Sequence, residues 1–152
     1  MKVLVYEKKK IKKNHNKFVN LKSLLSTSDI VSLNINYNEK LKNFFDYNYF
    51  KLMKRNALFV NTSRGELISE NCLIKALKQK IISGAILDVF TPEPIPSNAE
   101  TWDIPNLIVS PHISADDGNS YIKNTLLLFL KNLDCFVSNK TLVNQVDRSL
   151  GY

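Results

Sequence analysis

Three polar side chains that could take part in catalysis stand at or just beyond the ends of apolar runs. Arg64 follows one run, Asp88 lies near the end of the next, and His112 follows a third. A guanidinium can bind a carboxylate through two parallel hydrogen bonds, and an imidazole can exchange a proton near neutral pH. Together these residue types suit acid–base chemistry on a small anion.

Each of these residues has a simpler explanation when it is considered alone. Arg64 could cap a turn or pair with Glu66, and Asp88 could cap the turn after its strand. His112, beside Pro111, could be an ordinary loop histidine. In isolation the simpler explanations of Arg64 and His112 are the better ones. The functional interpretation therefore depends on whether the fold brings the three side chains together.

The apolar runs alternate with segments of helical periodicity. Strands are predicted at residues 2–6, 29–35, 57–61, 84–90 and 106–110. Helices are predicted near 21–26, at 39–54 and 69–80, and from a cap near Asp116 or Asp117 to about Val137. This alternation is typical of a parallel sheet built from βαβ units, and the few polar residues in the strands predict burial on both faces. Ligands of such sheets bind beyond the carboxyl ends of the strands, so Arg64, Asp88 and His112 should share one edge.

Length and composition favour one folded domain. The chain has 152 residues, and 44% of them are hydrophobic, which argues against an intrinsically disordered protein. The longest apolar run, Leu126 to Leu130, is too short to cross a bilayer. It makes the last predicted helix apolar on every side, so something should cover that helix. The N-terminus MKVLVYEKKK lacks the order of a secretory signal, and we expect a cytoplasmic protein without a membrane partner.

Charge and cysteine content disfavour two other classes of site. The net charge is +7, with lysines clustered in KKKIKK (8–13), but no recognised nucleic-acid-binding motif accompanies them. Lysine is abundant throughout the chain, so nucleic-acid binding is disfavoured. Cys72 and Cys135 lack metal-ligand spacing, and only His15 and His112 could join them. Two reduced thiols and no metal site are therefore predicted.

Four segments resemble the signature blocks of one enzyme family. Successive blocks of the D-isomer-specific 2-hydroxyacid dehydrogenases are similar, in order and spacing, to LLSTSDIVSLNI, ALFVNTSRGELISENCLIKAL, GAILDVFTPEPIP and NLIVSPHIS. The resemblance runs from about residue 2 to the C-terminus, where LVNQVDRSLGY is similar to the tail of glyoxylate/hydroxypyruvate reductase-like members. It implies a Rossmann-like, doubly wound α/β fold. It also implies an NAD-dependent oxidoreductase that interconverts a 2-keto acid and a D-2-hydroxy acid by hydride transfer.

The resemblance implies catalytic roles for three residues. Arg64 matches the arginine that holds the substrate's carboxylate, and His112 matches the general acid/base. Glu93 matches the carboxylate paired with that histidine, and a nearby anion favours imidazolium. Glu93, which stands between two prolines, could instead be an ordinary solvated residue.

The resemblance also implies a cofactor-binding set. Asp88 matches the residue that binds the nicotinamide carboxamide, and Asn36, Thr62 and Ser63 stand in segments that line the cofactor site. Glu7 matches the acidic residue that receives the adenosine ribose hydroxyls. A carboxylate there repels a 2′-phosphate, so NAD is favoured over NADP. Acidic residues often follow strands, and a lysine run lies beside Glu7, so this match is the weakest.

The sequence departs from the family at the N-terminus. No Gly-x-Gly-x-x-Gly segment occurs among its four glycines, and MKVLVYE matches the second strand of the family's nucleotide domain. We therefore expect the first strand, the phosphate loop and the preceding substrate domain to be missing. Because the first strand is central in the order 3-2-1-4-5-6, residues 2–6 and 57–61 should each lose a partner or pair together.

These departures shape the predicted organisation. Residues 1–115 are expected to form a partial NAD-binding domain, and residues 116–152 a C-terminal helix and tail that in the family return towards the substrate domain. The chain is interpreted as a truncated or split enzyme, whose second chain would supply the phosphate loop and substrate domain. A non-catalytic remnant, or an NAD-sensing interaction module, is the alternative. Family members are commonly homodimers, so a homodimer is a further interpretation.

Overall fold

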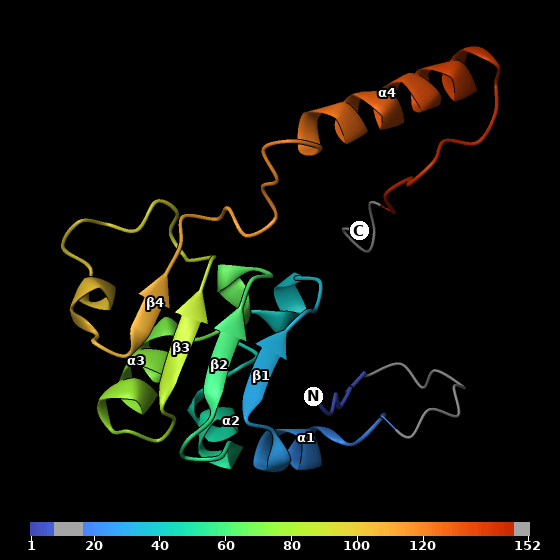
Figure 1. Ribbon diagram of the computed structural model, residues 1–152. Helices are drawn as coiled ribbons and strands as arrows, with labels where there is room; N and C mark the ends of the chain where they lie inside the picture. The colour runs from blue at the N-terminus through green and yellow to red at the C-terminus, as the bar shows by residue number, and fades with distance from the viewer. Residues whose placement is uncertain (8–16, 148–152) are drawn as a thin grey trace. The chain divides into compact units, whose positions relative to one another are not determined.

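The structure is a computed structural model that describes residues 1–7 and 17–147 (Figure 1). It contains two compact units, Met1–His112 and Ile113–Tyr152. The lysine cluster at 8–13 and the end of the C-terminal tail (148–152) lie outside the described residues. The nucleic-acid interpretation of those lysines therefore stays a prediction.

The first unit is built around a four-stranded parallel sheet. Its strands are β1 (Ile30–Leu33), β2 (Leu58–Asn61), β3 (Gly84–Leu87) and β4 (Leu107–Val109). They lie in the order β1-β2-β3-β4, and every neighbouring pair is parallel. The predicted α/β class is confirmed, although each strand is shorter than its apolar run.

The N-terminal segment does not form the predicted strand at 2–6. Val5 makes one isolated parallel bridge with Phe18, with the Val5 amide donating to the Lys17 carbonyl at 2.8 Å. The expectation that 57–61 would lose a partner is also wrong, because β2 pairs with both β1 and β3. Among the described strands, β1 is the edge strand on this side of the sheet, since β4 ends the other side.

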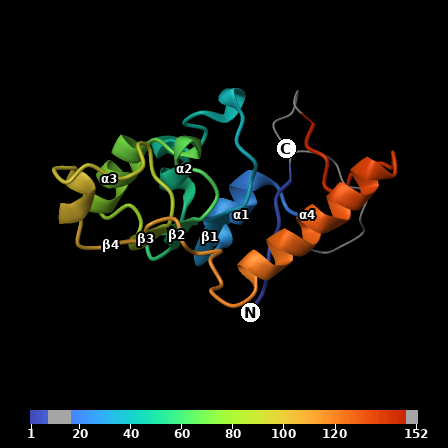
Figure 2. The same cartoon turned by 90° about the horizontal axis from the view of Figure 1, so that it is seen from above.

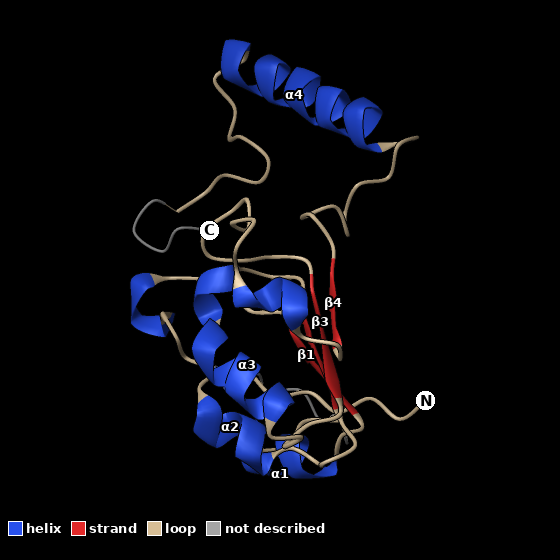
Figure 3. Ribbon diagram, turned by 90° about the vertical axis from the view of Figure 1, so that its left-hand side faces the viewer, coloured by secondary structure: helices blue, strands red, loops and turns tan. Residues whose placement is uncertain are grey.

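Helices cover one face of the sheet. They are α1 (Leu21–Thr27), α2 (Tyr47–Leu52) and α3 (Glu70–Lys78), and they lie on the same side of the strands (Figures 2 and 3). On the other face, Ile30, Leu58 and Ile108 are exposed. The prediction that both faces are buried is therefore wrong for the first unit as described.

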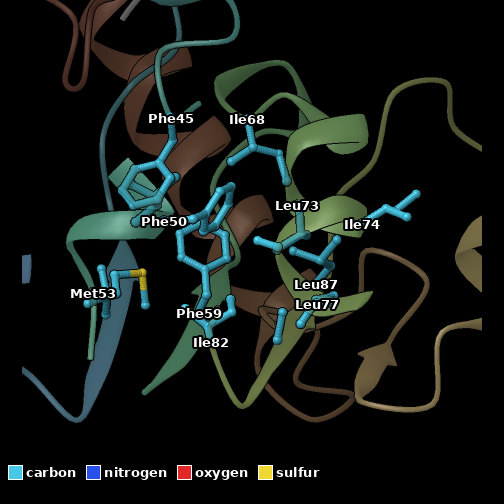
Figure 4. Packing of buried hydrophobic residues seen from close by; sticks show 14 of the residues in the cluster. Phe45, Phe50, Met53, Phe59, Ile68, Leu73, Ile74, Leu77, Ile82 and Leu87 are labelled. Carbon is cyan, nitrogen blue, oxygen red and sulfur yellow. The ribbon is translucent and has the colours of Figure 1, made fainter. Parts of the chain in front are cut away.

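The core lies between the helices and the sheet (Figure 4). Phe45, Phe50 and Phe59 form its centre, with ring centroids 4.9 Å apart for Phe45 with each of the other two and 5.1 Å apart for Phe50 with Phe59. Each such pair contributes roughly 0.5–1.5 kcal/mol beyond the burial of apolar area. Because Phe59 belongs to β2, the aromatic cluster fixes the strand that leads to Arg64.

The predicted helix at 39–54 is divided into two pieces. A 3₁₀ turn, η1 (Glu39–Leu41), ends before Asn43, whose φ of 54° is in the left-handed region. Phe45 then forms a parallel bridge with Ile68, and Asp46 caps α2 by accepting from the amides of Asn48 and Tyr49. Tertiary pairing of Phe45 therefore overrides the helical periodicity of this segment.

The second unit contains one long helix, α4 (Tyr121–Val137). It begins at Tyr121, four residues after the predicted cap at Asp117, whose carboxylate accepts from the backbone amides of Asn119 and Ser120 and holds a turn there. None of its residues is buried, so the covering expected for this apolar helix is not provided by the described residues. No described helix combines the length and apolarity needed to span a membrane.

Candidate active site

The carboxyl edge of the sheet brings together the residues that follow β2, β3 and β4. Arg64 comes three residues after the end of β2, and Asp88 directly follows β3. Ser110 directly follows β4, and His112 lies two residues further on. Because the strands are parallel and in register, all of these residues stand at one edge, as predicted.

A buried asparagine fixes the turn that carries Arg64. Asn61, with 0% exposure, donates from Nδ2 to the Arg64 carbonyl at 2.9 Å and accepts at Oδ1 from the Ser63 amide at 3.1 Å. The Ser63 hydroxyl donates to the carbonyl of Leu33, at the end of β1, at 2.8 Å. The turn is thus tied to two strands. Asn61 is missed by the sequence analysis, although an asparagine that ends an apolar run is a signal for such a turn.

The guanidinium of Arg64 is exposed at this turn. Arg64 is the N-cap residue of a 3₁₀ turn, η2 (Gly65–Leu67), and its Nη1 donates to the Ser63 carbonyl at 2.7 Å. Of the two simpler explanations, pairing with Glu66 is not found, since the described residues show no ion pair of Arg64, whereas Nη1 alone is used within the turn through its bond to the Ser63 carbonyl. The guanidinium therefore keeps donors available for an external anion.

Gly65 allows this turn to lie directly against the loop after β3. An added Cβ at Gly65 would lie 2.3 Å from both the carbonyl carbon and the carbonyl oxygen of Phe90. Its backbone is not in the left-handed region, so close approach alone demands a glycine here. Gly65 is a second supporting residue that the sequence analysis misses.

Glu93 and His112 form the predicted pair. Glu93 Oε2 lies 2.9 Å from His112 Nδ1, and Glu93 Oε1 accepts from the Phe90 amide at 2.8 Å. His112 has a φ of 56°, a left-handed conformation that is uncommon for residues other than glycine. The side chains of His112 and Glu93 are 48% and 37% exposed, so the pair is open to a small ligand.

Hydrogen bonds keep Glu93 ionised. The bond with His112 is the larger cause and the Phe90 amide the next, and together they hold the pKa of the Glu93 carboxyl below its ordinary value. A carboxylate can only accept, so the proton between the two groups belongs to His112 Nδ1. The other ring nitrogen, Nε2, is not engaged by Glu93.

The lowered pKa of Glu93 leads to a pH prediction. A carboxyl whose folded pKa is depressed stabilises the fold fully above its unfolded value, here 4.5, and loses that contribution as pH falls through the lower folded pKa. We expect the Glu93 carboxyl to titrate below pH 4.5 in carbon-detected NMR of the full chain. Mutation of His112 to Ala should raise this midpoint, and an unchanged midpoint would contradict the assigned cause.

Asp88 is buried beside the pair. It is 1% exposed, it accepts from the Ser110 hydroxyl at 2.5 Å, and its amide donates to the Asn61 carbonyl at 3.0 Å. Ser110, which is not in the predicted set, therefore links the ends of β3 and β4. A buried carboxylate held in this way is an oriented acceptor rather than a solvated turn cap.

The other predicted cofactor-binding residues have fewer contacts with the cluster of Arg64, Asp88, Glu93 and His112. Thr62 and Ser63 belong to the Arg64 turn, and Thr62 is exposed. Asn36 is exposed, three residues beyond β1. Glu7 is exposed two residues after the Val5 bridge, and no described contact joins it to the cluster.

Comparison with known proteins assigns the chain to a protein family. Residues 1–114 match the family described as D-isomer specific 2-hydroxyacid dehydrogenase, NAD binding domain. The chain is 35% identical over 133 residues to a glyoxylate reductase of Thermococcus litoralis, a match that covers 88% of this chain and 40% of that protein.

The solved structures that resemble this chain include members of the same family. D-lactate dehydrogenase with NAD⁺ from Lactobacillus jensenii superposes with a TM-score of 0.84 and 25% identity over 97% of this chain and 48% of that one. A D-isomer-specific 2-hydroxyacid dehydrogenase from Xanthobacter autotrophicus, in complex with NADPH, gives a TM-score of 0.79 and 27% identity over 90% and 44%. The chain thus spans less than half the length of these relatives. It belongs to the D-isomer-specific 2-hydroxyacid dehydrogenase family, and residues 1–114 correspond to the family's NAD-binding domain.

Proposed function

We propose that Arg64, Glu93 and His112 bind a small 2-keto or 2-hydroxy acid and transfer the proton in its redox interconversion. The observation that carries this proposal is the 2.9 Å contact of Glu93 with His112, on the same sheet edge as a guanidinium without an acidic partner in the described chain. A carboxylate, an imidazole and a free cation on one edge suit a substrate with an anion beside a carbonyl.

Each residue has a defined task. The Arg64 guanidinium binds the substrate carboxylate and so directs the keto group towards His112. In reduction, His112 Nε2 donates its proton to the keto oxygen, and in oxidation it takes the hydroxyl proton. When bound, a nicotinamide dinucleotide would supply the hydride to the carbon that bears this oxygen in reduction, or accept the hydride from that carbon in oxidation. Glu93 holds the Nδ1 proton and stabilises imidazolium when it forms.

The residues of this chain fit one end of that cofactor. Asp88 is buried and oriented by Ser110, as an acceptor for a carboxamide requires. The sequence holds no glycine-rich phosphate loop, so it offers no corresponding group for the pyrophosphate. We propose NAD rather than NADP, because the exposed Glu7 carboxylate would repel a 2′-phosphate. The relatives with known structures include complexes with either cofactor.

We further propose that a second polypeptide completes the sheet. Its strand would pair in parallel with the free edge of β1 and carry the glycine-rich loop. Support comes from the single bridge of Val5 with Phe18, which lies outside the four-stranded sheet and leaves the far edge of β1 without a described strand. Unpaired backbone groups on an edge strand are a ready template for such a partner.

The 152-residue chain alone should neither bind NADH tightly nor reduce glyoxylate or hydroxypyruvate. The physical reason is the lack of a phosphate loop, which removes the amides that hold the pyrophosphate. Fluorescence titration with NADH and a steady-state assay of the purified chain measure both outcomes. Clear turnover that disappears in the His112→Ala variant would show that the chain is sufficient by itself.

A chimaera tests the proposed activity. Residues 1–114 would replace the matching segment of the Thermococcus litoralis glyoxylate reductase, which supplies the remainder of the fold. We expect glyoxylate reduction with a preference for NADH over NADPH. A chimaera that folds and binds NADH but does not reduce glyoxylate or hydroxypyruvate would favour the alternative, a non-catalytic NAD-sensing or interaction module.

A further inference from the structure

Ser110 stands between two parts of the proposed site, although no task has been assigned to it there. Leu87 pairs with Val109, so Asp88 and Ser110 are the first residues beyond the paired ends of β3 and β4 (Figure 1). His112 follows Ser110 by two residues. Ser110 is therefore next to the proposed carboxamide acceptor on one side and close to the proposed proton donor on the other.

Ser110 uses its backbone as well as its side chain in this position. Its amide donates to the Leu87 carbonyl at 2.9 Å, and its carbonyl accepts from the His112 amide at 3.0 Å. Its hydroxyl donates to Asp88 Oδ1 at 2.5 Å. Ser110 is thus bonded to β3 and holds one functional residue on each side.

The bond from the hydroxyl restricts the carboxylate of Asp88. The terminal torsion of an aspartate side chain has a broad distribution, so a carboxylate without a fixed donor can rotate. Asp88 is 1% exposed, and a hydrogen bond to a buried carboxylate is strong and directional. The hydroxyl of Ser110 therefore sets the direction in which Asp88 offers its oxygen atoms.

The same bond restrains the turn that carries His112. Only Pro111 separates Ser110 from His112, and the φ angle of a proline is fixed. His112 itself has a φ of 56°, a sparsely populated conformation that persists only where its surroundings hold it. Loss of the hydroxyl would remove one of the bonds that tie this turn to the end of β3.

We propose that Ser110 is a positioning residue that fixes Asp88 and His112 relative to each other. The inference rests on the proposed function, which gives these two residues their tasks. Hydride transfer occurs at the carbon of the substrate carbonyl and proton transfer at its oxygen. The group that orients the nicotinamide and the group that carries the proton must therefore be placed together, and one hydroxyl bond serves both.

The first test uses the chimaera that contains residues 1–114. Ser110→Ala should raise the dissociation constant for NADH about tenfold, as expected for loss of a hydrogen bond to a charged group. The dissociation constant for ADP-ribose, which lacks the nicotinamide, should not change. Ser110→Ala should also lower kcat for glyoxylate about tenfold or more, because a small displacement of reacting groups is costly. Ser110→Thr keeps the hydroxyl and should restore both NADH affinity and kcat.

Ser83→Ala is the matched control. The Ser83 hydroxyl also bonds within the protein, to the carbonyls of Asn56 and Ala57 at 3.1 and 2.9 Å, but Ser83 precedes β3 and lies at the other edge of the sheet. This variant should bind NADH and ADP-ribose as the unaltered chimaera does. Circular dichroism verifies that each variant is folded.

The second test uses the full 152-residue chain without cofactor. The His112 Nδ1 proton, which lies between the ring and Glu93, should give a downfield signal in the proton NMR spectrum. Ser110→Ala should broaden this signal, because a looser turn exposes the proton to exchange with water. Ser83→Ala and Ser110→Thr should leave the signal sharp. An equally sharp signal in Ser110→Ala would overturn the link between Ser110 and His112.

The binding data separate this inference from the proposed function. Unchanged NADH affinity in Ser110→Ala, or equal losses of NADH and ADP-ribose affinity, would overturn the positioning role. An unaltered chimaera that binds NADH without reducing glyoxylate or hydroxypyruvate would instead contradict the proposed function. In that case the comparison of NADH with ADP-ribose still decides whether Ser110 orients the carboxamide acceptor.

Discussion

In the chimaeric enzyme, His112→Ala is expected to lower kcat for glyoxylate reduction by about 10²–10⁴-fold, the range for loss of a general acid. The imidazole stands at the carboxyl edge of the sheet, and its Nδ1 is already engaged by Glu93 at 2.9 Å. Its removal leaves no group to protonate the keto oxygen. Steady-state kinetics with a saturating dinucleotide measure the effect, and the affinity for NADH should be unchanged.

Two companion variants separate proton transfer from substrate binding. Arg64→Ala should chiefly raise KM for glyoxylate, because the guanidinium binds the carboxylate in the ground state as well as in the transition state. Glu93→Gln should lower kcat and shift the pH profile, because an amide cannot stabilise imidazolium as a carboxylate does. A His112→Ala chimaera that retains near-normal kcat would refute the assigned role of His112.

Gly65→Ala is expected to destabilise the full chain by about 1–3 kcal/mol or more, as overpacking does. The added Cβ would lie 2.3 Å from backbone atoms of Phe90, which cannot rotate away as a flexible side chain could. The turn after β2 and the loop after β3 must therefore separate. Urea denaturation followed by circular dichroism gives the change in the free energy of unfolding.

Gly118→Ala is the matched control. An added Cβ at Gly118 has no atom within 4 Å, so this variant should unfold at the urea concentration of the unaltered chain. In the chimaera, Gly65→Ala should also raise KM for glyoxylate, because Arg64 adjoins the displaced residue. Equal stability of the two alanine variants would show that the Arg64 turn does not need its contact with Phe90.

The sequence was sufficient to predict the four strands of the sheet and the residues that meet at its edge, although the further strand predicted at 2–6 does not form. Apolar runs that end in a polar residue locate the strands, and parallel pairing then fixes which ends coincide, as Arg64, Asp88 and His112 show. The contact of Glu93 with His112 came from the family resemblance, since nothing in the spacing of these two residues requires it.

Other features depend on tertiary contacts that local patterns do not contain. The supporting roles of Asn61 and Ser110 depend on bonds to segments that only the folded sheet brings near. The helix predicted from the spacing at 39–54 is interrupted, because Phe45 pairs with Ile68. The apolar residues of the strands also led to a wrong prediction, that both faces of the sheet are buried. Apolar residues show that a face can be covered, but they do not show which segment covers it.

The bare surface of α4 affects how the chain would behave in a cell. Ile122, Phe129 and Phe136 are each more than half exposed, as are several leucines between them. Chaperones and proteases bind exposed nonpolar segments of this kind. Such segments also promote aggregation, which increases with protein concentration. The abundance and half-life of the chain should therefore depend on how soon after synthesis α4 is covered.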